Sequence, residues 1–335
     1  MKKNGVKLAD IAARTGFSVN TVSHALNDKP DISAHTKAYI KQVADEMGYI
    51  ANASASLLRS GKSKSIAVIV GDVSNPHFAI MIKEIERMLR VSGYTAFIFN
   101  TDENEELERN AIKAAKSKSA DGIILCPVQK SDKNIKFLDS LEIPYVLIGR
   151  HFAGRNTDYV VCDDENGGYL AAKHLLENNH RNILTITAPQ YISSARERMA
   201  GIRRAFLEYG IEALPEQTYE FPLVLRAGTQ RLEAVFAAHK SCTAVICFSD
   251  FLAMEAAYVL KSLGKEIPMD ISIIGFDNIV SKVLFPLPLT SVTSSKTKMS
   301  KCAVESLLNK IEYNIPQEAV VLPTKLVKRE STKKI

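Results

Sequence analysis

Residues 8–27 have the sequence LADIAARTGFSVNTVSHALN, and its spacing predicts two short helices joined by a tight turn. Between the helices, Gly16 can adopt the positive φ that ends a helix, and the Ser18 hydroxyl can cap the next one. Apolar residues recur at helical period on both sides of this turn, namely Leu8, Ile11 and Ala12 before it and Val22, Ala25 and Leu26 after it. The stretch therefore predicts a helix-turn-helix, although a simple three-helix packing module would share the pattern.

The outer face of the second helix suits contact with DNA. Its short side chains, Val19, Asn20, Ser23 and His24, are fit to probe a major groove. Residues 1–64 contain ten Lys and Arg against five Asp and Glu, whereas residues 65–335 contain 33 against 32. The net charge of +6 therefore lies almost entirely in the N-terminal segment, as expected of a DNA-binding domain, although a solvated basic surface would fit the charge equally well.

A third helix is expected from Ser33 or Ala34 to Met47, and Gly48 would end it. Its inner face is predicted to contain Tyr39, Ile40, Val43 and Met47. Residues 52–59 have the composition of about two further helical turns, too few for a stable isolated helix, which needs roughly 12–15 residues. The sequence thus predicts a headpiece at residues 1–48, followed by a hinge helix and linker at residues 49–64.

From residue 65 onward, short apolar runs alternate with amphipathic segments. Strands are predicted at residues 66–70, 96–99, 122–125, 145–148, 160–161, 183–186, 244–248 and 271–274. Helices are expected between them, for example at residues 78–91, 105–118, 167–178, 196–209 and 251–263. This alternation is typical of parallel sheets, and a segment of this length is too long to form a single sheet of ordinary size. We therefore expect an α/β core of two parallel-sheet lobes over residues 65–335, with a ligand between them at the carboxyl ends of the strands.

The cysteines indicate a reducing compartment. Most of them lie in apolar runs and none forms a CxxC pair, so we expect buried, reduced thiols and no metal site; they are Cys126, Cys162, Cys242, Cys247 and Cys302. No apolar run approaches the ~20 residues needed to cross a bilayer, and the N-terminus lacks the apolar core of a signal peptide. We expect a cytoplasmic protein without membrane association.

Several short motifs follow the helix-turn-helix in order along the chain. They are Ile32-Ser33, Gly48-Tyr49, Asn52, Ala55, Leu58-Arg59, Ser74-Asn75-Pro76-His77-Phe78, Asp163, Gly167-Gly168, Arg196-Glu197-Arg198-Met199-Ala200-Gly201, Ile273-Ile274-Gly275-Phe276-Asp277 and Pro288-Leu289-Thr290. In this order, and over essentially the whole chain, the sequence resembles the LacI/GalR transcriptional regulators. The resemblance implies a periplasmic-binding-protein-like core whose two lobes are crossed by three strands. It implies an N-lobe of about residues 65–162 with 294–323, and a C-lobe of about residues 163–293 with 324–335.

The resemblance also implies which residues contact DNA. By position, Val19 would touch a thymine methyl group, Asn20 an adenine edge and His24 a guanine. Many relatives have Arg at the His24 position, so the preferred base step is expected to differ here. Phosphate contacts, which set the register on the duplex, would come from Ser18, Thr21 and Asn27.

Within the hinge, Ala55 and Leu58 would also contact DNA. The resemblance implies that Leu58 enters the minor groove as a wedge and kinks the duplex; the alternative is packing on the core surface. The family usually has Pro before Asn52, whereas this chain has Ala51. Because Pro pre-sets the first helical φ, we expect this hinge helix to form less readily.

An effector pocket is implied at His77, Phe78, Arg150, Arg196, Ser249, Asp250 and Asp277. Arg and Asp side chains bind hydroxyl or carboxylate groups through paired hydrogen bonds, and an aromatic ring provides a flat surface for a sugar ring. The set predicts a polyol, a sugar or a sugar acid. Arg150 and Asp277 each follow a predicted strand, so turn or cap roles are the alternative. Some sugar-binding relatives have Gln where this chain has Ser294, so their ligand is not carried over.

Together these features predict a DNA-binding transcriptional regulator, in the simplest case a repressor, that acts as a homodimer. Its partners would be a near-palindromic double-stranded operator and a carbohydrate-like effector. The alternatives are an α/β enzyme and a solute-binding protein, each with an accessory helical domain. The chain has no GxGxxG or GxSxG motif, and Gly61-Lys62-Ser63 precedes a predicted strand, whereas a phosphate loop follows one. We therefore expect no catalytic residues and no cofactor.

Overall fold

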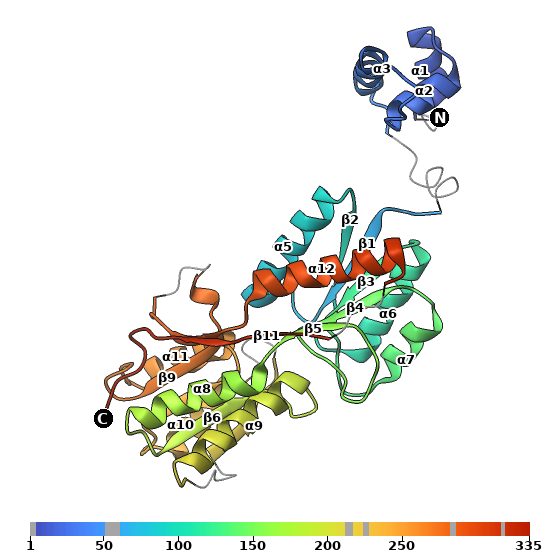
Figure 1. Cartoon of the computed structure of the whole chain (residues 1–335). Coiled ribbons are helices and arrows are strands. Elements are labelled where there is room, and N and C mark those ends of the chain that lie inside the picture. Colours follow the sequence, from blue (N-terminus) through green and yellow to red (C-terminus); the bar gives the residue numbers. More distant parts are fainter. Residues whose placement is uncertain (1–4, 51–60, 212–216, 224–227, 282–285, 316–318) are drawn as a thin grey trace. The chain divides into compact units, whose positions relative to one another are not determined.

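The computed structural model describes residues 5–50, 61–211, 217–223, 228–281, 286–315 and 319–335 (Figure 1). The chain divides into two compact units, Met1–Ser63 and Lys64–Ile335. The described part of the first unit is helical, and the second contains two sheets with helices packed against them. The expected fold class, a helix-turn-helix headpiece with a two-lobed α/β core, is therefore confirmed.

The headpiece consists of α1 (Leu8–Thr15), α2 (Val19–Leu26) and α3 (Ala34–Glu46). Gly16 ends α1 with a φ of 76°, which a residue without a Cβ adopts at little cost. The Ser18 hydroxyl accepts a hydrogen bond of 3.0 Å from the Thr21 amide and so caps α2. The core of the unit is small and apolar, and its buried members are Ile11, Ala12, Val22, Ala25, Ile40 and Ala44.

The predicted inner face of α3 needs one correction. Tyr39 is 44% exposed, and its ring lies edge-on to Phe17 at 6.5 Å between centroids. The buried residues of α3 are Ile40, Val43 and Ala44, which follow one another at helical spacing. Tyr39 precedes Ile40 by a single residue, and a step of 100° turns it away from the core.

The first sheet has the strand order β11-β5-β4-β3-β1-β2 and is parallel throughout. Its strands are β1 (Ser65–Val70), β2 (Thr95–Asn100), β3 (Gly122–Leu125), β4 (Tyr145–Ile148), β5 (Tyr159–Cys162) and β11 (Val320–Leu322). The helices of this lobe are α5 (Pro76–Val91), α6 (Glu105–Ser117), α7 (Lys133–Ser140) and α12 (Lys296–Tyr313). Every residue of β1 is buried, which is typical of a strand covered by helices on both faces.

The second sheet has the order β12-β10-β9-β8-β6-β7. Its strands are β6 (Ile183–Thr187), β7 (Thr218–Glu220), β8 (Ala244–Cys247), β9 (Ser272–Asp277), β10 (Thr290–Thr293) and β12 (Lys325–Val327). They are accompanied by α8 (Asp164–Glu177), α9 (Ser193–Glu208), α10 (Thr229–Ala238), α11 (Asp250–Ser262) and the short 3₁₀ helix η2 (Ile279–Ser281). Only the edge strand β12 departs from the expected parallel arrangement among the described strands, because it runs antiparallel to β10.

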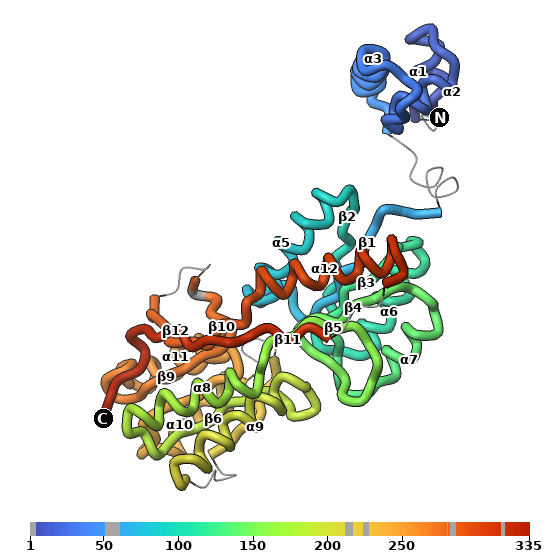
Figure 2. Tube along the Cα trace, in the orientation of Figure 1, coloured from blue at the N-terminus to red at the C-terminus, as the bar shows by residue number. Residues whose placement is uncertain are grey.

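The chain passes between the two sheets three times, from β5 to α8, from β10 to α12 and from β11 to β12 (Figure 2). Two of these crossing segments are hydrogen-bonded to each other. The Asp163 amide donates to the Leu322 carbonyl at 2.8 Å, and the Thr324 hydroxyl donates to the Asp163 carbonyl at 3.1 Å. The lobes are thus joined by short, mutually bonded segments rather than by a broad continuous sheet.

Helices α8 and α9 pack at unusually close range. A Cβ added at Gly201 would lie 1.8 Å from the Glu165 carbonyl oxygen, and one added at Gly168 would lie 2.0 Å from the Arg198 carbonyl oxygen. Both obstacles are backbone atoms, so no change of side-chain rotamer would relieve them. The two glycines allow the helices to approach closely and so set the position of α9.

Some short elements escaped the sequence analysis. Strands β7, β10, β11 and β12 have three or four residues, and none of them is a fully buried apolar run like the equally short β3 and β4. The predicted burial of the cysteines is confirmed for four of the five, and Cys302 is partly exposed. No helix within the described residues is long and apolar enough to cross a membrane.

Candidate functional site

The outer face of α2 presents the side chains predicted to contact DNA. Ser18, Val19, Asn20 and Asn27 are exposed, and Val19 is 47% accessible although it is apolar. Thr21 is half-buried, and its hydroxyl lies 2.9 Å from that of Ser18. An exposed valine among short polar groups at the start of a helix suits insertion into a groove.

The ring of His24 is held by an acidic neighbour that the sequence analysis did not single out. Its Nδ1 lies 2.6 Å from Asp31 Oδ2, and this hydrogen bond lowers the pKa of Asp31. The contact leaves Nε2 available for another partner. Asp31 is therefore in a position to orient the imidazole, a role for which the sequence offered no signal.

Ala51, Ala55 and Leu58 lie in residues 51–60, outside the described part of the chain. Their predicted contacts with DNA therefore rest on the sequence and on the family resemblance.

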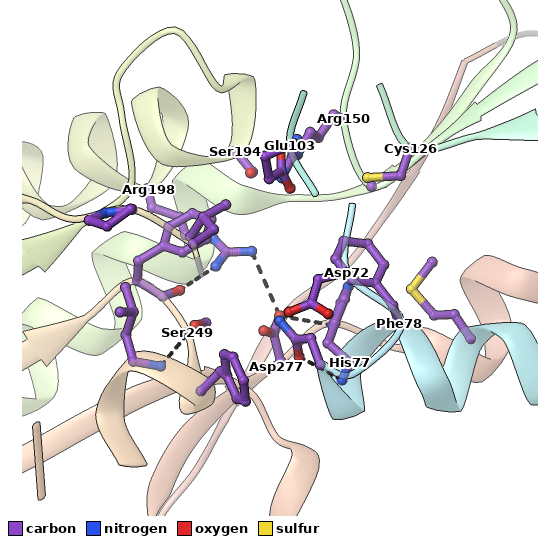
Figure 3. Close-up of a pocket in the computed structure, with 18 of the residues that line it drawn as sticks. Asp72, His77, Phe78, Glu103, Cys126, Arg150, Ser194, Arg198, Ser249 and Asp277 are labelled. Carbon is purple, nitrogen blue, oxygen red and sulfur yellow. Dashed lines mark hydrogen bonds and ion pairs between the residues drawn. The ribbon is translucent and has the colours of Figure 1, made fainter. Parts of the chain in front are cut away.

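A cavity lies between the two lobes, at the carboxyl ends of strands from both sheets (Figure 3). The N-lobe contributes Asp72, Asn75, His77, Phe78, Met81, Glu103, Cys126, Ile148, Gly149 and Arg150. The C-lobe contributes Ser194, Arg198, Pro222, Leu223, Phe248, Ser249, Phe251, Leu252, Glu255 and Asp277. Of the predicted effector residues, the structure brings together His77, Phe78, Arg150, Ser249 and Asp277.

Arg198 is the central cation on the C-lobe side. Its Nε donates to Asp164 Oδ1 at 2.7 Å, and its Nη1 donates to the Phe248 carbonyl. The guanidinium lies 3.4 Å from the centroid of the Phe276 ring and 4.4 Å from that of Phe248. Burial raises the pKa of Asp164 to about 6, which Arg198 partly opposes. These contacts fix the guanidinium and leave Nη2 directed at Asp277, 3.8 Å away.

Asp277 ends β9 and faces the other lobe. Its Oδ1 lies 3.3 Å from Nδ1 of His77. Despite this short distance, that ring nitrogen forms no hydrogen bond with any described residue. Burial lowers the pKa of His77 to about 4, although the Asp277 charge opposes this, so the ring is neutral at pH 7. Asp277 has a φ of 96°, and the ammonium group of Lys296 donates to its carbonyl. A strained residue at the end of a strand, held from both sides, is typical of a binding site.

Arg150 is paired with Glu103, a residue the sequence analysis missed. Its Nη1 and Nη2 each donate to a carboxylate oxygen of Glu103 at 2.7 Å, and Nη1 also donates to the Pro127 carbonyl at 3.0 Å. The guanidinium side chain is only 5% exposed. Arg150 thus lines the cavity, but its charge is already balanced by a two-point contact.

Two predicted effector residues do not line this cavity. Arg196 is exposed and donates weakly to the Gln190 carbonyl at 3.5 Å. Arg198 lines the cavity instead, in the place that was predicted for Arg196. Two residues along a helix are about 200° apart, so these arginines lie on opposite faces of α9. Both belong to the run Arg196-Glu197-Arg198, in which the sequence alone gave no reason to choose the second.

Asp250 is the other residue that lies outside the cavity. It is fully buried, and its carboxylate accepts from the Ile279 amide at 2.7 Å and from the Ser291 hydroxyl at 2.5 Å. Burial raises the pKa of Asp250 to about 7, and the nearby charge of Asp277 adds to the effect. As the first residue of α11, it points toward β10 and η2, and it ties these elements together. The preceding Ser249 lines the cavity and caps α11 through the Leu252 amide.

The cavity has no arrangement typical of a metal centre. Within the described ranges, no group of three or more His, Cys, Asp or Glu side chains is placed to hold a metal ion. The buried carboxylates instead contact guanidinium, hydroxyl or amide groups.

Comparison with known proteins identifies both parts of the chain. Residues 7–52 match the bacterial regulatory proteins of the lacI family, and residues 63–330 match the periplasmic binding proteins and sugar binding domain of the LacI family. The chain is 31% identical over 309 residues to the HTH-type transcriptional repressor PurR of Aliivibrio salmonicida (strain LFI1238), with 91% of this chain and 92% of the relative covered.

Solved structures share the fold of this chain. The lac repressor dimer bound to operator and the anti-inducer ONPF is 22% identical, with a TM-score of 0.85 over 98% of this chain and all of that one. A periplasmic binding protein/LacI transcriptional regulator from Alkaliphilus metalliredigens QYMF, complexed with D-xylulofuranose, is 27% identical, with a TM-score of 0.70 over 80% of this chain and 99% of that one. The chain therefore belongs to the LacI family, as a DNA-binding transcriptional repressor with a ligand-binding domain and not as an enzyme.

Proposed function

We propose that this repressor binds a near-palindromic operator as a homodimer, and that a carbohydrate-like effector between the lobes of the core sets its affinity for that operator. The observation that carries the proposal is the convergence of Arg198, Asp277 and His77, from both lobes, on one cavity. A ligand held by groups from two lobes stabilises one lobe arrangement over another. The lac repressor dimer on its operator supports the proposed stoichiometry by analogy.

On the DNA side, the proposal assigns base contacts to Val19, Asn20 and His24. All three lie on α2, at a spacing that one helix can present to a single major groove. Phosphate contacts are assigned to Ser18, Thr21 and Asn27, which set the register but carry no sequence information. Two headpieces in a dimer would then occupy half-sites about one helical turn, ~34 Å, apart.

On the effector side, the gap between Arg198 Nη2 and Asp277 Oδ1 suits a hydroxyl group. At 3.8 Å the two atoms do not form a close hydrogen bond, and a ligand hydroxyl beside the pair could accept from the guanidinium and donate to the carboxylate. Phe78, Phe248 and Phe251 provide apolar walls for the carbon face of a sugar ring. The D-xylulofuranose complex of a relative supports the same chemical class.

Coupling between the two sites needs only a modest free energy. A coupling free energy of about 1–3 kcal/mol changes operator affinity by roughly 5- to 150-fold. The mutually bonded crossing segments at Asp163, Leu322 and Thr324 are the natural place for a change in lobe angle. We assign the response of the DNA-binding unit to the hinge at residues 49–64.

The proposal is tested in two steps with the full-length protein. A thermal-shift screen against sugars, sugar acids, sugar phosphates and nucleobases identifies ligands, and fluorescence anisotropy of a labelled palindrome then measures operator affinity with and without them. We expect a sugar to raise the melting temperature and to change operator affinity at least fivefold. Binding of nucleobases alone, or a sugar that leaves operator affinity unchanged, would refute the effector assignment.

A matched pair of variants locates the ligand. Asp277→Asn keeps the size of the side chain and suits the positive φ of 96°, since Asn tolerates this region, but it removes the charged acceptor. We expect this variant to lose at least tenfold in sugar affinity. Arg196→Ala, on the exposed face of α9, is the control and should bind sugar as the wild type does. Equal losses in both variants would argue against this cavity.

A further inference from the structure

On the basis of the proposed function, we infer that the cavity selects an uncharged or positively charged polyol and discriminates against phosphorylated and carboxylated sugars. The inference narrows the sequence-based expectation, which included sugar acids because two arginines were assigned to the pocket. It rests on the charges that line the cavity and on the partners that already occupy its arginines.

The described residues that line the cavity carry an excess of negative charge. Among them, four carboxylates, from Asp72, Glu103, Glu255 and Asp277, stand against two guanidinium groups, from Arg150 and Arg198. Two charged groups lie directly behind these residues, and their charges offset each other. The Asp164 carboxylate contacts Arg198, and the Lys296 ammonium group contacts the Asp277 carbonyl. His77 adds no positive charge at pH 7, since burial lowers its pKa to about 4. An anionic ligand would therefore enter a site of its own sign.

Each arginine of the cavity already has a carboxylate partner. Arg150 makes its two-point contact with Glu103, and a phosphate could replace that contact only by leaving the Glu103 carboxylate unpaired. Arg198 is bonded through Nε to Asp164, and its faces are covered by the rings of Phe276 and Phe248. Nη2 alone points into the cavity, toward a carboxylate.

The carboxylates, in contrast, have acceptor capacity to spare. Glu255 is 7% exposed, and within the described part of the chain its carboxylate accepts one hydrogen bond, from the Thr229 hydroxyl to Oε1 at 2.7 Å. Among the hydrogen bonds between described residues, Asp72 receives the Ser74 amide and hydroxyl, both on Oδ1. A carboxylate offers several acceptor positions and no donor. The ligand must therefore supply donors, which hydroxyl and ammonium groups do and which phosphate and carboxylate groups do not.

Calorimetric titration of the full-length protein with charge-matched probes tests the inference. Two series are used first: D-ribose with D-ribose 5-phosphate and D-ribonate, and D-glucose with D-glucosamine, D-glucose 6-phosphate and D-gluconate. We expect the neutral sugar or the amino sugar of at least one series to bind at least tenfold more tightly than its anionic counterparts. Phosphorylated or carboxylated sugars that bind as tightly as the neutral ones would overturn the inference and leave the effector proposal standing.

Two variants sharpen the test. Glu103→Gln removes one cavity carboxylate and releases the Arg150 guanidinium, so we expect the preference against D-glucose 6-phosphate to shrink at least fivefold. Glu106→Gln makes the same change of charge at an exposed position three residues away, outside this cavity, and should leave the preference unaltered. An identical shift in both variants would show that overall charge, and not the cavity, decides. If no sugar of any charge binds the wild type, the proposed function and this inference both fail.

Discussion

Replacing Gly201 with alanine should destabilise the core, although alanine is the better helix former. Gly201 lies within α9, where a Cβ would be placed 1.8 Å from the Glu165 carbonyl oxygen and 2.6 Å from the Tyr169 amide nitrogen. Both atoms belong to the backbone of α8, so no side chain can move aside. Since ordinary Cβ contacts begin at 3.4 Å, the two helices would have to separate locally by more than an ångström.

The expected size of the effect follows from two opposing contributions. Overpacking a well-packed interior costs typically ~1–3 kcal/mol, and a clash between two backbones belongs at the upper end. The gain in helix propensity from Gly to Ala is about 1 kcal/mol. We therefore expect a net loss of roughly 2 kcal/mol in the free energy of unfolding. For a unit of this size the melting temperature should fall by roughly 4–8 °C.

Urea and thermal unfolding, followed by circular dichroism, measure this loss. Ala200→Gly, at the adjacent exposed position of α9, is the control, and propensity alone predicts that it loses about 1 kcal/mol. Because Arg198 precedes Gly201 by one helical turn, Gly201→Ala should also weaken sugar binding. A Gly201→Ala protein as stable as the wild type, or more stable, would refute the close-packing argument.

Three further outcomes are expected. Asp31→Asn removes the carboxylate that orients His24, so the ratio of specific to nonspecific DNA affinity should fall a few-fold in anisotropy titrations, and an unchanged ratio would remove the orienting role. Leu58→Ala should reduce specific binding far more than nonspecific binding, because a wedge acts only at a deformable operator centre; equal losses would contradict the wedge. Neutral His77 contributes stability that is lost as the pH falls from 6.5 to about 4, since the unfolded chain takes up the proton first. His77→Gln should remove about 3 kcal/mol of that pH dependence in urea unfolding, and an unaltered pH profile would argue against a buried neutral ring.

Most of the helices and long strands could be predicted because their signals are local, although α7, α10 and α12 were not among the helices that we predicted. Apolar spacing, a capping hydroxyl and a glycine with positive φ lie within a few residues of one another, as at Gly16 and Ser18. Strands β3 and β4 were predicted at their observed bounds, since short β-branched and apolar runs between polar segments suffice. Tyr39 was misplaced because one helical step separates an inner position from an outer one.

The candidate site was predicted only in part, because the sequence does not show in which direction a side chain points or with which distant residue it pairs. His77, Phe78, Arg150, Ser249 and Asp277 follow strand ends, and the carboxyl ends of parallel strands meet at one edge. Arg196 and Asp250 have the right chemistry, but helix rotation turns one toward solvent and the other into the lobe. Glu103 and Glu255 could not be found from their neighbours in sequence, because what distinguishes them is contact with residues far along the chain.

The order of residues along the chain was thus enough to specify a DNA-reading helix pair, an alternating α/β core and the family to which they belong. Only the tertiary structure decided which charged side chains line the cavity and which of them neutralise one another. Arg150 and Glu103 are 47 residues apart, yet they form a two-point contact that balances one of the two cations for which a sugar acid was included among the expected ligands. Electrostatic energy depends on distance in space, and a linear sequence does not contain that distance.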